Sequence, residues 1–427
     1  MKKMSISAAV LALILAFPCV ICAADQTYQQ LKILVDVLDL VKENYVDEVE
    51  IQKLVHGAAN GIVRELDDFS QFMDSDTYKR IKSDTEGEFG GLGIRIGLRD
   101  RWITVITPIP GTPAYRAGIF PGDRIIKIED ESAKDMTPDD AVKKLRGTPG
   151  TKIRITVARE PESKDPAAQW TTHDFTITRE TIRIEAVQHR MMDGKVGYLR
   201  LIDFTGHAAE DTFAALNDLK KQGMDALVLD MRYNPGGLLS AAVDISRYFL
   251  GSNKMIVFTK GRKKENYQEF RAASKAPFEN LPLVALVNGG SASASEIVAG
   301  ALQDNKRAVI IGSKTFGKAS VQSVIPLSDA SGLRLTVAKY HTPSGRSIQR
   351  HENEKENTGG IQPDMEIKVP REIEIKLMSQ FEEIFVPGKA AQPAVKKEER
   401  VKDEILDRAL EILKARDILS SLRQKEG

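Results

Sequence analysis

Residues 226–237 read ALVLDMRYNPGG, and this stretch decides the fold class. Its first four residues are an unbroken apolar run, which is typical of a strand that is buried on both faces. The proline and glycines that follow predict a sharp turn, and residues 238–250 then have the pattern of a helix. A buried strand that turns directly into a helix argues for a layered α/β core.

The same alternation continues on both sides of this stretch. Residues 283–287 form a second wholly apolar strand, and helices are predicted over residues 208–222 and 294–303. Further strands are predicted over residues 196–201, 309–311, 321–325 and 333–339. We therefore place an α/β core over residues 181–370.

Residues 86–180 have a different texture, with short β segments separated by glycines and prolines. Their order resembles that of a PDZ domain, and Gly91-Leu92-Gly93-Ile94 looks like the PDZ loop that binds a terminal carboxylate. Glycines let backbone N–H groups converge on an anion, and the adjoining strand edge can accept an extended peptide. The alternative reading is a plain hairpin turn that needs glycine dihedral angles.

Both ends of the chain beyond these regions are predicted to be helical. Residues 25–85 carry apolar stripes at helical spacing, and residues 371–427 contain a linker at 387–395 before a charged amphipathic helix. The helices within residues 28–85 are too small for a rich core, so we expect them to pack on something else or on a second subunit. Because of their exposed stripes, both helical regions are candidate elements of a homodimer.

The first 24 residues have the composition of a secretory signal peptide. Lys2 and Lys3 precede an apolar run of about a dozen residues, and Ala23-Ala24 provides the small residues of a cleavage site. The run is shorter than the roughly 20 apolar residues of a membrane span. We expect an exported protein of the periplasm or cell envelope, soluble after cleavage.

The overall composition narrows the classes of function. The 427 residues include 61 basic and 60 acidic side chains; losing Lys2 and Lys3 with the signal peptide leaves 59 against 60. Such a balance offers no broad basic face, so nucleic acid is not an expected partner. The only cysteines, Cys19 and Cys22, lie in the signal peptide. No metal site and no cofactor is expected.

Two strand-to-helix junctions are candidates for chemistry. At the first, the amides of Gly236 and Gly237 can point at an anion above the helix end. The second, residues 287–296, carries three serines, and a serine at a helix N-terminus can be a nucleophile. Ser293 and Glu296 also have the spacing of a capping box, which would make Ser293 a helix cap. The residues alone do not separate these readings.

Residues 315–322 place a lysine among small and apolar residues. Burial of Lys318 against Phe316 and Val321 would disfavour its ammonium form and move its pKa from about 10.4 toward neutrality. A neutral lysine is a competent general base. The alternative is an ordinary surface lysine at the start of a strand.

Taken together, these blocks resemble the carboxy-terminal processing peptidases, also called tail-specific proteases. The resemblance rests on SASASEIVAGALQD (291–304), TFGKASVQ (315–322), DMRYNPGG (230–237) and TPSGRSI (342–348), and on the order of signal peptide, helices, PDZ domain and core. It implies a crotonase- or ClpP-like core, Ser293 as nucleophile, Lys318 as base and Gln322 as the residue that orients the lysine.

The resemblance also implies a cofactor-free serine endopeptidase that cuts proteins near their C-termini, with the PDZ domain binding substrate tails or gating the site. A regulatory adaptor is a further candidate partner. At a helix start, the amide of Ala294 is well placed as an oxyanion donor, with Gly236 or Gly237 as the second. In a straight strand Lys318 and Gln322 would lie about 13 Å apart, so we expect a break between them.

Three alternatives stay open at this level. The first is a PDZ scaffold with an inactive core, and the second is an acyl-CoA enzyme, because crotonase-like proteins share a similar core. The third is a Ser-His-Asp hydrolase, although none of the six histidines has metal-ligand spacing with another and the chain lacks a Gly-x-Ser-x-Gly elbow.

Overall fold

The computed structural model describes residues 28–109, 111–161, 169–350, 359–370, 372–374, 376–377, 380 and 401–425. The predicted signal peptide, both cysteines and the linker at 387–395 lie outside them. The chain divides into two compact units, one from the described part of Met1–Asp76 with Gln322–Thr336, the other from Thr77–Val321 with Val337–Gly427. Within the described ranges, no helix is long and apolar enough to cross a membrane.

The N-terminal part of the smaller unit, residues 28–76, is mostly helical, as predicted. It contains a helix over residues 28–44 and α2 (Ile51–Arg64). It also contains β1 (Gln71–Met73), which pairs antiparallel with the start of β18 (Gly332–His341). The sequence analysis predicted only helices here, because a three-residue strand is too short for its period to be seen.

The PDZ-like region is a β-rich body with its own core. Its sheet has the order β3-β4-β5-β7-β8, with β6 paired to β5. The bounds are β3 Ile94–Arg99, β4 Trp102–Pro108, β5 Arg124–Ile128, β6 Glu131–Ser132, β7 Lys152–Arg159 and β8 Thr171–Thr178, with helices α4 Pro113–Arg116 and α5 Pro138–Leu145. Alternate residues of β7, Ile153, Ile155 and Val157, are buried, which is the pattern predicted for this strand.

Helix α3 (Ser75–Glu86) leads into this body, and a two-stranded ribbon connects it to the core. The ribbon consists of β2 (Glu88–Gly91) and β9 (Glu180–Arg183) in antiparallel register.

A six-stranded sheet forms the centre of the α/β core, in the order β10-β11-β12-β15-β16-β19. All neighbouring pairs are parallel except β10 with β11. The bounds are β10 Val187–Met192, β11 Val196–Leu201, β12 Ala226–Asp230, β15 Leu283–Val287, β16 Val309–Gly312 and β19 Met365–Glu366. Every residue of β12 and β15 is buried, which agrees with their apolar runs.

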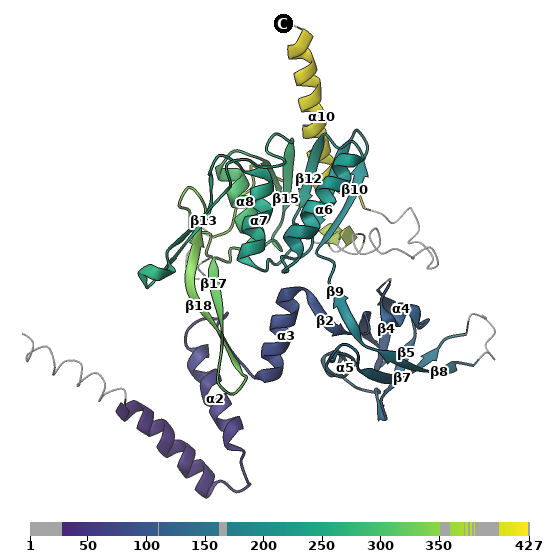
Figure 1. The fold of residues 1–427 in the computed structure, drawn as a ribbon, viewed down its shortest axis with the longest axis vertical. Coiled ribbons are helices and arrows are strands. Elements are labelled where there is room, and N and C mark those ends of the chain that lie inside the picture. The colour runs from purple at the N-terminus through teal and green to yellow at the C-terminus, as the bar shows by residue number, and fades with distance from the viewer. Residues whose placement is uncertain are drawn as a thin grey trace, which may run out of the picture. The chain divides into compact units, whose positions relative to one another are not determined.

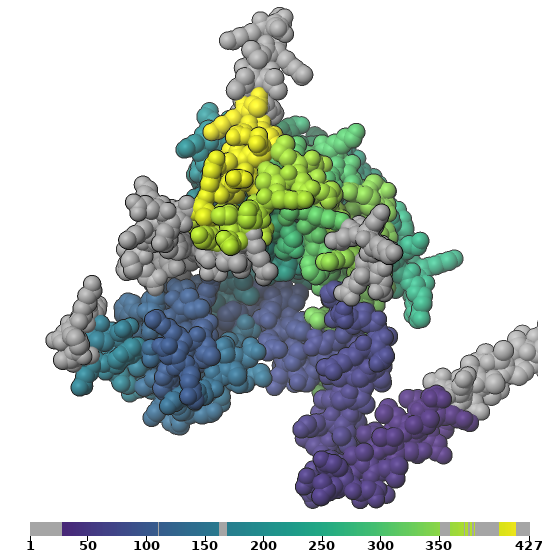
Figure 2. Space-filling view, turned by 180° about the vertical axis from the view of Figure 1, so that it is seen from behind, coloured from purple at the N-terminus to yellow at the C-terminus, as the bar shows by residue number. Residues whose placement is uncertain are grey.

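Helices cover both faces of this sheet, which explains why its strands lack an alternating polar face. On one face lie α6 (Ala208–Lys221), α7 (Leu239–Phe249) and α8 (Ala294–Asp304), packed on residues such as Leu227, Leu229 and Val287 (Figure 1). The start of α10 (Glu404–Lys425) packs on the other face, against Val228 and Leu286 (Figure 2).

A buried ion pair fastens α10 to the core. Asp403, directly before the helix, accepts hydrogen bonds from two nitrogens of the Arg232 guanidinium at 2.8 Å each. Arg232 is 3% exposed and also donates to Asp230, which accepts a further hydrogen bond from Tyr198. Burial favours the neutral acid, but the Arg232 charge and these hydrogen bonds outweigh it and hold the pKa of Asp230 below its usual value.

A second sheet contains β13 (Met255–Gly261), which pairs with β14 (Gln268–Arg271) and with the end of β18. Strand β17 (Ser320–Pro326) pairs with β18. The segment from residue 313 to residue 319 has no regular structure, so Lys318 lies just before β17 and Gln322 lies within it. The irregular backbone expected between these two residues is therefore confined to residues 318 and 319.

Candidate active site

The two strand-to-helix junctions singled out in the sequence follow neighbouring parallel strands, β12 and β15. Their turns are therefore adjacent at the carboxyl edge of the sheet, where α/β proteins commonly bind ligands. The Ala292 amide donates to the Asn234 carbonyl at 3.0 Å, and the Asn288 side chain accepts from the Tyr233 amide at 2.9 Å. These bonds join the turns into one assembly.

The structure separates the three serines of this stretch. Ser291 and Ser295 are fully buried, and their hydroxyls donate to the carbonyls of Met231 and Asn234 at 2.8 and 2.9 Å. Both hydroxyls are thus part of the joint between the turns. Ser293, which lies between them, is partly exposed.

Ser293 has an unusual backbone conformation. Its φ of +56° is in the left-handed region, which costs a non-glycine residue about 1–3 kcal/mol unless the surroundings hold it. It is the N-cap of α8, and Glu296 completes the capping-box pairing by accepting the Ser293 N–H at 2.8 Å. The serine is therefore a helix cap and a partly exposed residue on a strained turn at the same time.

Gly236 lies against this serine. A Cβ at position 236 would be 2.7 Å from the Ser293 Cβ and 2.9 Å from the Ala294 nitrogen, and Gly236 has a φ of +106°. Only glycine allows so close an approach at this dihedral angle.

The three candidate oxyanion donors differ in their hydrogen bonding. The amide of Gly236 donates to the side-chain oxygen of Asn234 at 2.9 Å. Within the described part of the chain, no hydrogen bond is found for the amides of Ala294 and Gly237. Ala294 is the first residue of α8, whose amide has no acceptor within the helix.

The carboxylate of Glu296 connects the serine turn to the lysine segment. One oxygen accepts the amides of Ser293 and Lys318 at 2.8 and 2.9 Å. The other accepts the Gly317 amide at 2.7 Å and the Thr315 hydroxyl at 2.6 Å. Glu296 is completely buried; burial raises its pKa, and the four hydrogen bonds oppose that rise only in part.

Tyr340 joins the same cluster from β18. Its hydroxyl donates to the Lys318 carbonyl. Its amide donates to the Ala319 carbonyl at 2.9 Å, and the residue is 3% exposed. Burial and the charge of Glu296 raise the pKa of Tyr340 well above its usual value, so the hydroxyl keeps its proton.

The structure thus brings the backbone of Lys318 to the turn that carries Ser293. Lys318 is partly buried, and the neighbouring Phe316 is 46% exposed while Ala319 is fully buried. Gln322 belongs to the smaller unit, where its side-chain amide donates to the Phe69 carbonyl at 2.6 Å.

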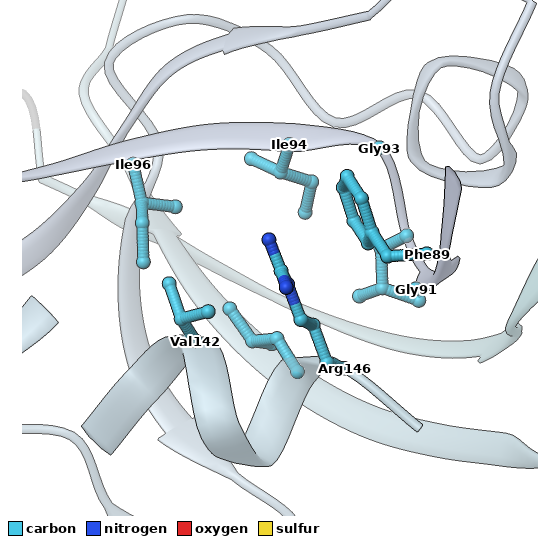
Figure 3. A pocket seen from close by; sticks show the side chains of 9 residues that line it. Phe89, Gly91, Gly93, Ile94, Ile96, Val142 and Arg146 are labelled. Carbon is cyan, nitrogen blue, oxygen red and sulfur yellow. The ribbon is translucent and has the colours of Figure 1, made fainter. Parts of the chain in front are cut away.

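The predicted PDZ loop lines a pocket with an empty volume of about 400 Å³. Figure 3 shows Ile94 and Ile96 on β3 facing Val142 on α5, with the Arg146 side chain extending into the space between strand and helix. The guanidinium of Arg146 lies 4.1 Å from the centre of the Phe89 ring. The full set of lining residues is Phe89, Gly91, Leu92, Gly93, Ile94, Ile96, Val142, Leu145 and Arg146.

Gly93 is needed for the shape of this loop. It has a φ of +73°, and a Cβ there would lie 2.3 Å from the Thr112 side chain. The carbonyls of Leu92 and Gly93 accept hydrogen bonds from the amides of Ala114 and Ile109 at 3.0 and 2.8 Å. The walls beside the loop are mostly apolar, so the pocket suits a hydrophobic side chain.

Among the described residues, no group of three or more His, Cys, Asp or Glu side chains is arranged to hold a metal ion.

Comparison with known proteins identifies the family. A profile of peptidase family S41 matches residues 195–367, a PDZ profile matches 104–159, and the profile of the activating protease CtpB N-terminal domain matches 22–77. The carboxy-terminal-processing protease of Bartonella bacilliformis is 42% identical over 348 residues, which cover 81% of this chain and 76% of that protein. The chain belongs to the carboxy-terminal processing peptidases.

Two further relatives found by sequence, from a Synechocystis species and from Bacillus subtilis, agree with this assignment. The carboxyl-terminal-processing protease of a Synechocystis species is 36% identical to the peptidase over 78% of the chain and 75% of that protein. The carboxy-terminal processing protease CtpA of Bacillus subtilis is 34% identical over 77% of this chain and 67% of that protein. Among solved structures, the photosystem II D1 C-terminal processing protease aligns at 29% identity with a TM-score of 0.45, covering 78% of the peptidase and 92% of that chain.

The family places the chain among proteases that carry a PDZ domain. The resemblance seen in the sequence is thereby confirmed, as is the predicted α/β fold with a β-rich PDZ domain.

Sequence reasoning missed two residues of the cluster around Ser293. Glu296 was recognised only as a capping residue, and its reach to the lysine segment has no local sequence signal. Tyr340 was not singled out at all. Its only signal is a bulky tyrosine in a predicted strand that leads into the TPSGRSI block, five residues before Gly345.

Proposed function

We propose that this peptidase is an exported serine endopeptidase that cuts protein substrates near their C-termini, with Ser293 as nucleophile and Lys318 as general base. The observation that carries the proposal is the Glu296 carboxylate, which accepts the backbone amides of both residues on one oxygen. Ser293 is also the partly exposed member of its trio, on a strained turn at a helix N-terminus.

The reaction follows from this arrangement. Lys318 with an uncharged amine takes the proton of the Ser293 hydroxyl while the serine oxygen attacks the scissile carbonyl. The protonated lysine then gives its proton to the leaving amine, and an acyl-enzyme remains. The neutral Lys318 amine then deprotonates a water molecule, which hydrolyses that ester. The protonated lysine returns a proton to the serine oxygen, which restores Ser293. Gln322 is our candidate for orienting the lysine.

The developing oxyanion needs two donors close to Ser293. The amide of Ala294, at the positive end of α8, is the first candidate. Gly236 and Gly237 are candidates for the second. The amide of Gly236 is engaged by Asn234, which favours Gly237 for this role. Loss of one such donor typically costs about 2.7–4 kcal/mol of transition-state stabilisation.

The PDZ domain indicates which class of substrate the peptidase binds. A glycine loop beside an apolar pocket fits a free carboxylate followed by a hydrophobic side chain, so we propose that it recognises or gates the C-terminal tails of substrates. A regulatory adaptor that binds the same domain would act on this step.

Export and self-association complete the proposal. Export rests on the sequence of residues 1–24 and is tested by N-terminal sequencing of the protein recovered from the producing cell. A homodimer rests on apolar side chains left exposed on the helix over residues 28–44, such as Leu31, Ile33 and Leu40. A sedimentation experiment that returns a monomer would reject it.

The central test compares the rates at which wild type, Ser293→Ala and Lys318→Arg cleave an internally quenched fluorogenic peptide with a free C-terminus. We expect activity to vanish in Ser293→Ala. Lys318→Arg should be equally inactive, since a guanidinium keeps its proton and cannot act as base. Cleavage by Ser293→Ala would overturn the assignment. A protein that binds C-terminal peptides but never cuts them would favour the PDZ scaffold instead.

A further inference from the structure

The hairpin of β13 and β14 carries a local concentration of positive charge. Four of the five residues from 260 to 264 are basic, and Lys339 on β18 lies directly opposite Lys260. The chain as a whole is close to neutral, with 61 basic and 60 acidic side chains, so this excess is confined to one place. The five exposed side chains, which we call the basic face, are those of Lys260, Arg262, Lys263, Lys264 and Lys339.

No carboxylate neutralises the basic face. Within the part of the chain that the structure describes, none of its five side chains has an ion pair or a hydrogen bond. Of the two acidic residues in the hairpin, Glu265 likewise has no ion pair there. Glu269 is already engaged, because it accepts the Tyr267 hydroxyl at 2.7 Å and pairs with Arg271 at 2.9 Å. The five positive charges therefore meet solvent without a fixed partner.

Two of these charges are held against each other. Lys260 and Lys339 are direct cross-strand partners, and the next pair in the ladder, Thr259 and Tyr340, is 4% and 3% exposed. Alternation along the strands therefore directs both lysines outward. Like charges directly opposite each other destabilise an antiparallel pair. Burial and then the charges of both lysines lower the pKa of His341. A sheet that keeps such a costly pair indicates that the positive charge is used for binding.

The backbone beneath the basic face is held firmly. The side chain of Asn266 donates to the Val337 carbonyl at 3.0 Å, and the Asn266 carbonyl accepts the Thr259 hydroxyl at 2.9 Å. The turn is thereby fastened to both β13 and β18, and it projects from the core (Figure 1, Figure 2). Beside it, Tyr267 is 50% exposed, and the centre of its ring lies 6.0 Å from that of Phe258.

We propose that the basic face is a docking surface for a lipid bilayer that carries anionic phospholipids, and that it holds the peptidase reversibly at the membrane. Long cationic side chains without fixed partners suit the diffuse field of such a surface, whereas a tight protein interface favours groups that are already held in place. Tyr267 adds an amphipathic ring of the kind that is enriched at membrane interfaces. The inference goes beyond the proposed function and needs none of its chemistry.

The test measures how much of the purified protein floats with vesicles of phosphatidylcholine alone and with vesicles that also contain phosphatidylglycerol. The variant combines three changes in the basic face: Lys260→Gln, Arg262→Gln and Lys263→Gln. The matched control removes the same net charge from exposed lysines on β5, β7 and α6, through Lys127→Gln, Lys152→Gln and Lys221→Gln. Melting temperatures check that all three proteins are folded.

We expect wild type and the control to bind the phosphatidylglycerol vesicles and not those of phosphatidylcholine alone. The variant should bind the anionic vesicles at least about tenfold more weakly, because each basic residue at such a surface is worth about fivefold in binding. Equal binding of wild type to both kinds of vesicle, no binding to either, or equal losses in the variant and the control would overturn the inference.

Two further measurements keep the outcome decisive even if the variant does not fold. Wild type bound to anionic vesicles must be released as the salt concentration rises, because salt screens exposed charges; retention at high salt rejects the inference. Binding of wild type to immobilised polyglutamate, without binding to phosphatidylglycerol vesicles, would assign the basic face to acidic proteins and reject the membrane. Since no substrate is cleaved in these experiments, their result stands apart from the proposed role of Ser293.

Discussion

One oxygen of the Glu296 carboxylate accepts the backbone amides of Ser293 and Lys318, at 2.8 and 2.9 Å. The two residues are 25 positions apart in the chain and come from different turns. A single buried side chain therefore sets the spacing of their backbones. All four groups that surround this carboxylate are hydrogen-bond donors.

Glu296→Gln should therefore disrupt the cluster despite its similar shape. In either orientation, the amide nitrogen of glutamine meets two donors and leaves them without an acceptor. Each buried donor left unsatisfied costs about 1–3 kcal/mol, so we expect a lower melting temperature and a loss of kcat of at least about tenfold. The control is Glu210→Gln, an exposed glutamate in the first turn of α6. Equal activity in both variants would contradict the role given to Glu296.

Gly236→Ala should reduce activity through crowding at Ser293. The added methyl group would lie 2.7 Å from the Ser293 Cβ, where one turn or the other has to move. Gly223→Ala is the matched control, because Gly223 also has a positive φ, +91°, but a Cβ there meets nothing within 4 Å. Both variants should lose stability, by about 1 kcal/mol for the dihedral angle alone. A kinetic assay normalised to folded protein should show a large loss of kcat in Gly236→Ala only.

Asp403→Ala should loosen helix α10 from the sheet. The substitution removes two hydrogen bonds from the buried guanidinium of Arg232, although Asp230 remains as a partner. We expect unfolding in urea to show a loss of about 1–3 kcal/mol. Glu411→Ala, which breaks an exposed pair with Arg408 in the same helix, should stay within about 0.5 kcal/mol of wild type. Equal stabilities of the two variants would contradict the anchoring role of Asp403.

The smaller unit should lose stability in acid in a defined window. Hydrogen bonds from Ser331 and His56 lower the pKa of Asp329 from 3.8 to about 2. A carboxyl whose folded pKa is depressed stabilises the fold above its unfolded pKa, and this contribution disappears as the pH falls through the folded value. Melting temperatures of wild type should therefore drop more steeply between about pH 4 and pH 2 than those of Asp329→Asn. Parallel curves for the two proteins would show that Asp329 contributes nothing.

Val142→Asp should weaken peptide binding by the PDZ domain. A carboxylate in the wall of the pocket opposite Ile96 would repel a terminal carboxylate and spoil the apolar surface. We expect at least about a tenfold rise in Kd for a labelled peptide that ends in a free hydrophobic residue. Ile106→Asp alters an isoleucine that is 57% exposed on β4 and outside the pocket, and should bind as wild type does. Similar losses in both variants would place the binding site elsewhere.

Much of the fold could be predicted because its signals are local. The buried strands at 226–230 and 283–287 are continuous apolar runs, since helices cover both faces of their sheet. The helices that follow them begin within one or two residues of the predicted positions, because proline, glycine and serine mark the turns.

The rest depends on contacts between distant residues. Strand β1 exists because β18 offers it an edge, and nothing in residues 71–73 specifies this. Asn234 binds the Gly236 amide, an interaction that a count of glycines cannot reveal. The packing of the first turns of the charged C-terminal helix on the core of their own chain, through Ile405 and Leu406, also depends on such contacts.

The two flanking serines of the trio have a consequence for mutagenesis. Ser291 and Ser295 hold the adjoining turns together through fully buried hydroxyls. Replacing either serine with alanine should therefore lower kcat indirectly, by displacing the turn that carries Ser293. An alanine scan of this stretch would then report three apparently essential positions. Lowered turnover is consequently a poor guide to which oxygen becomes acylated, and trapping the ester followed by mass spectrometry is the experiment that identifies it.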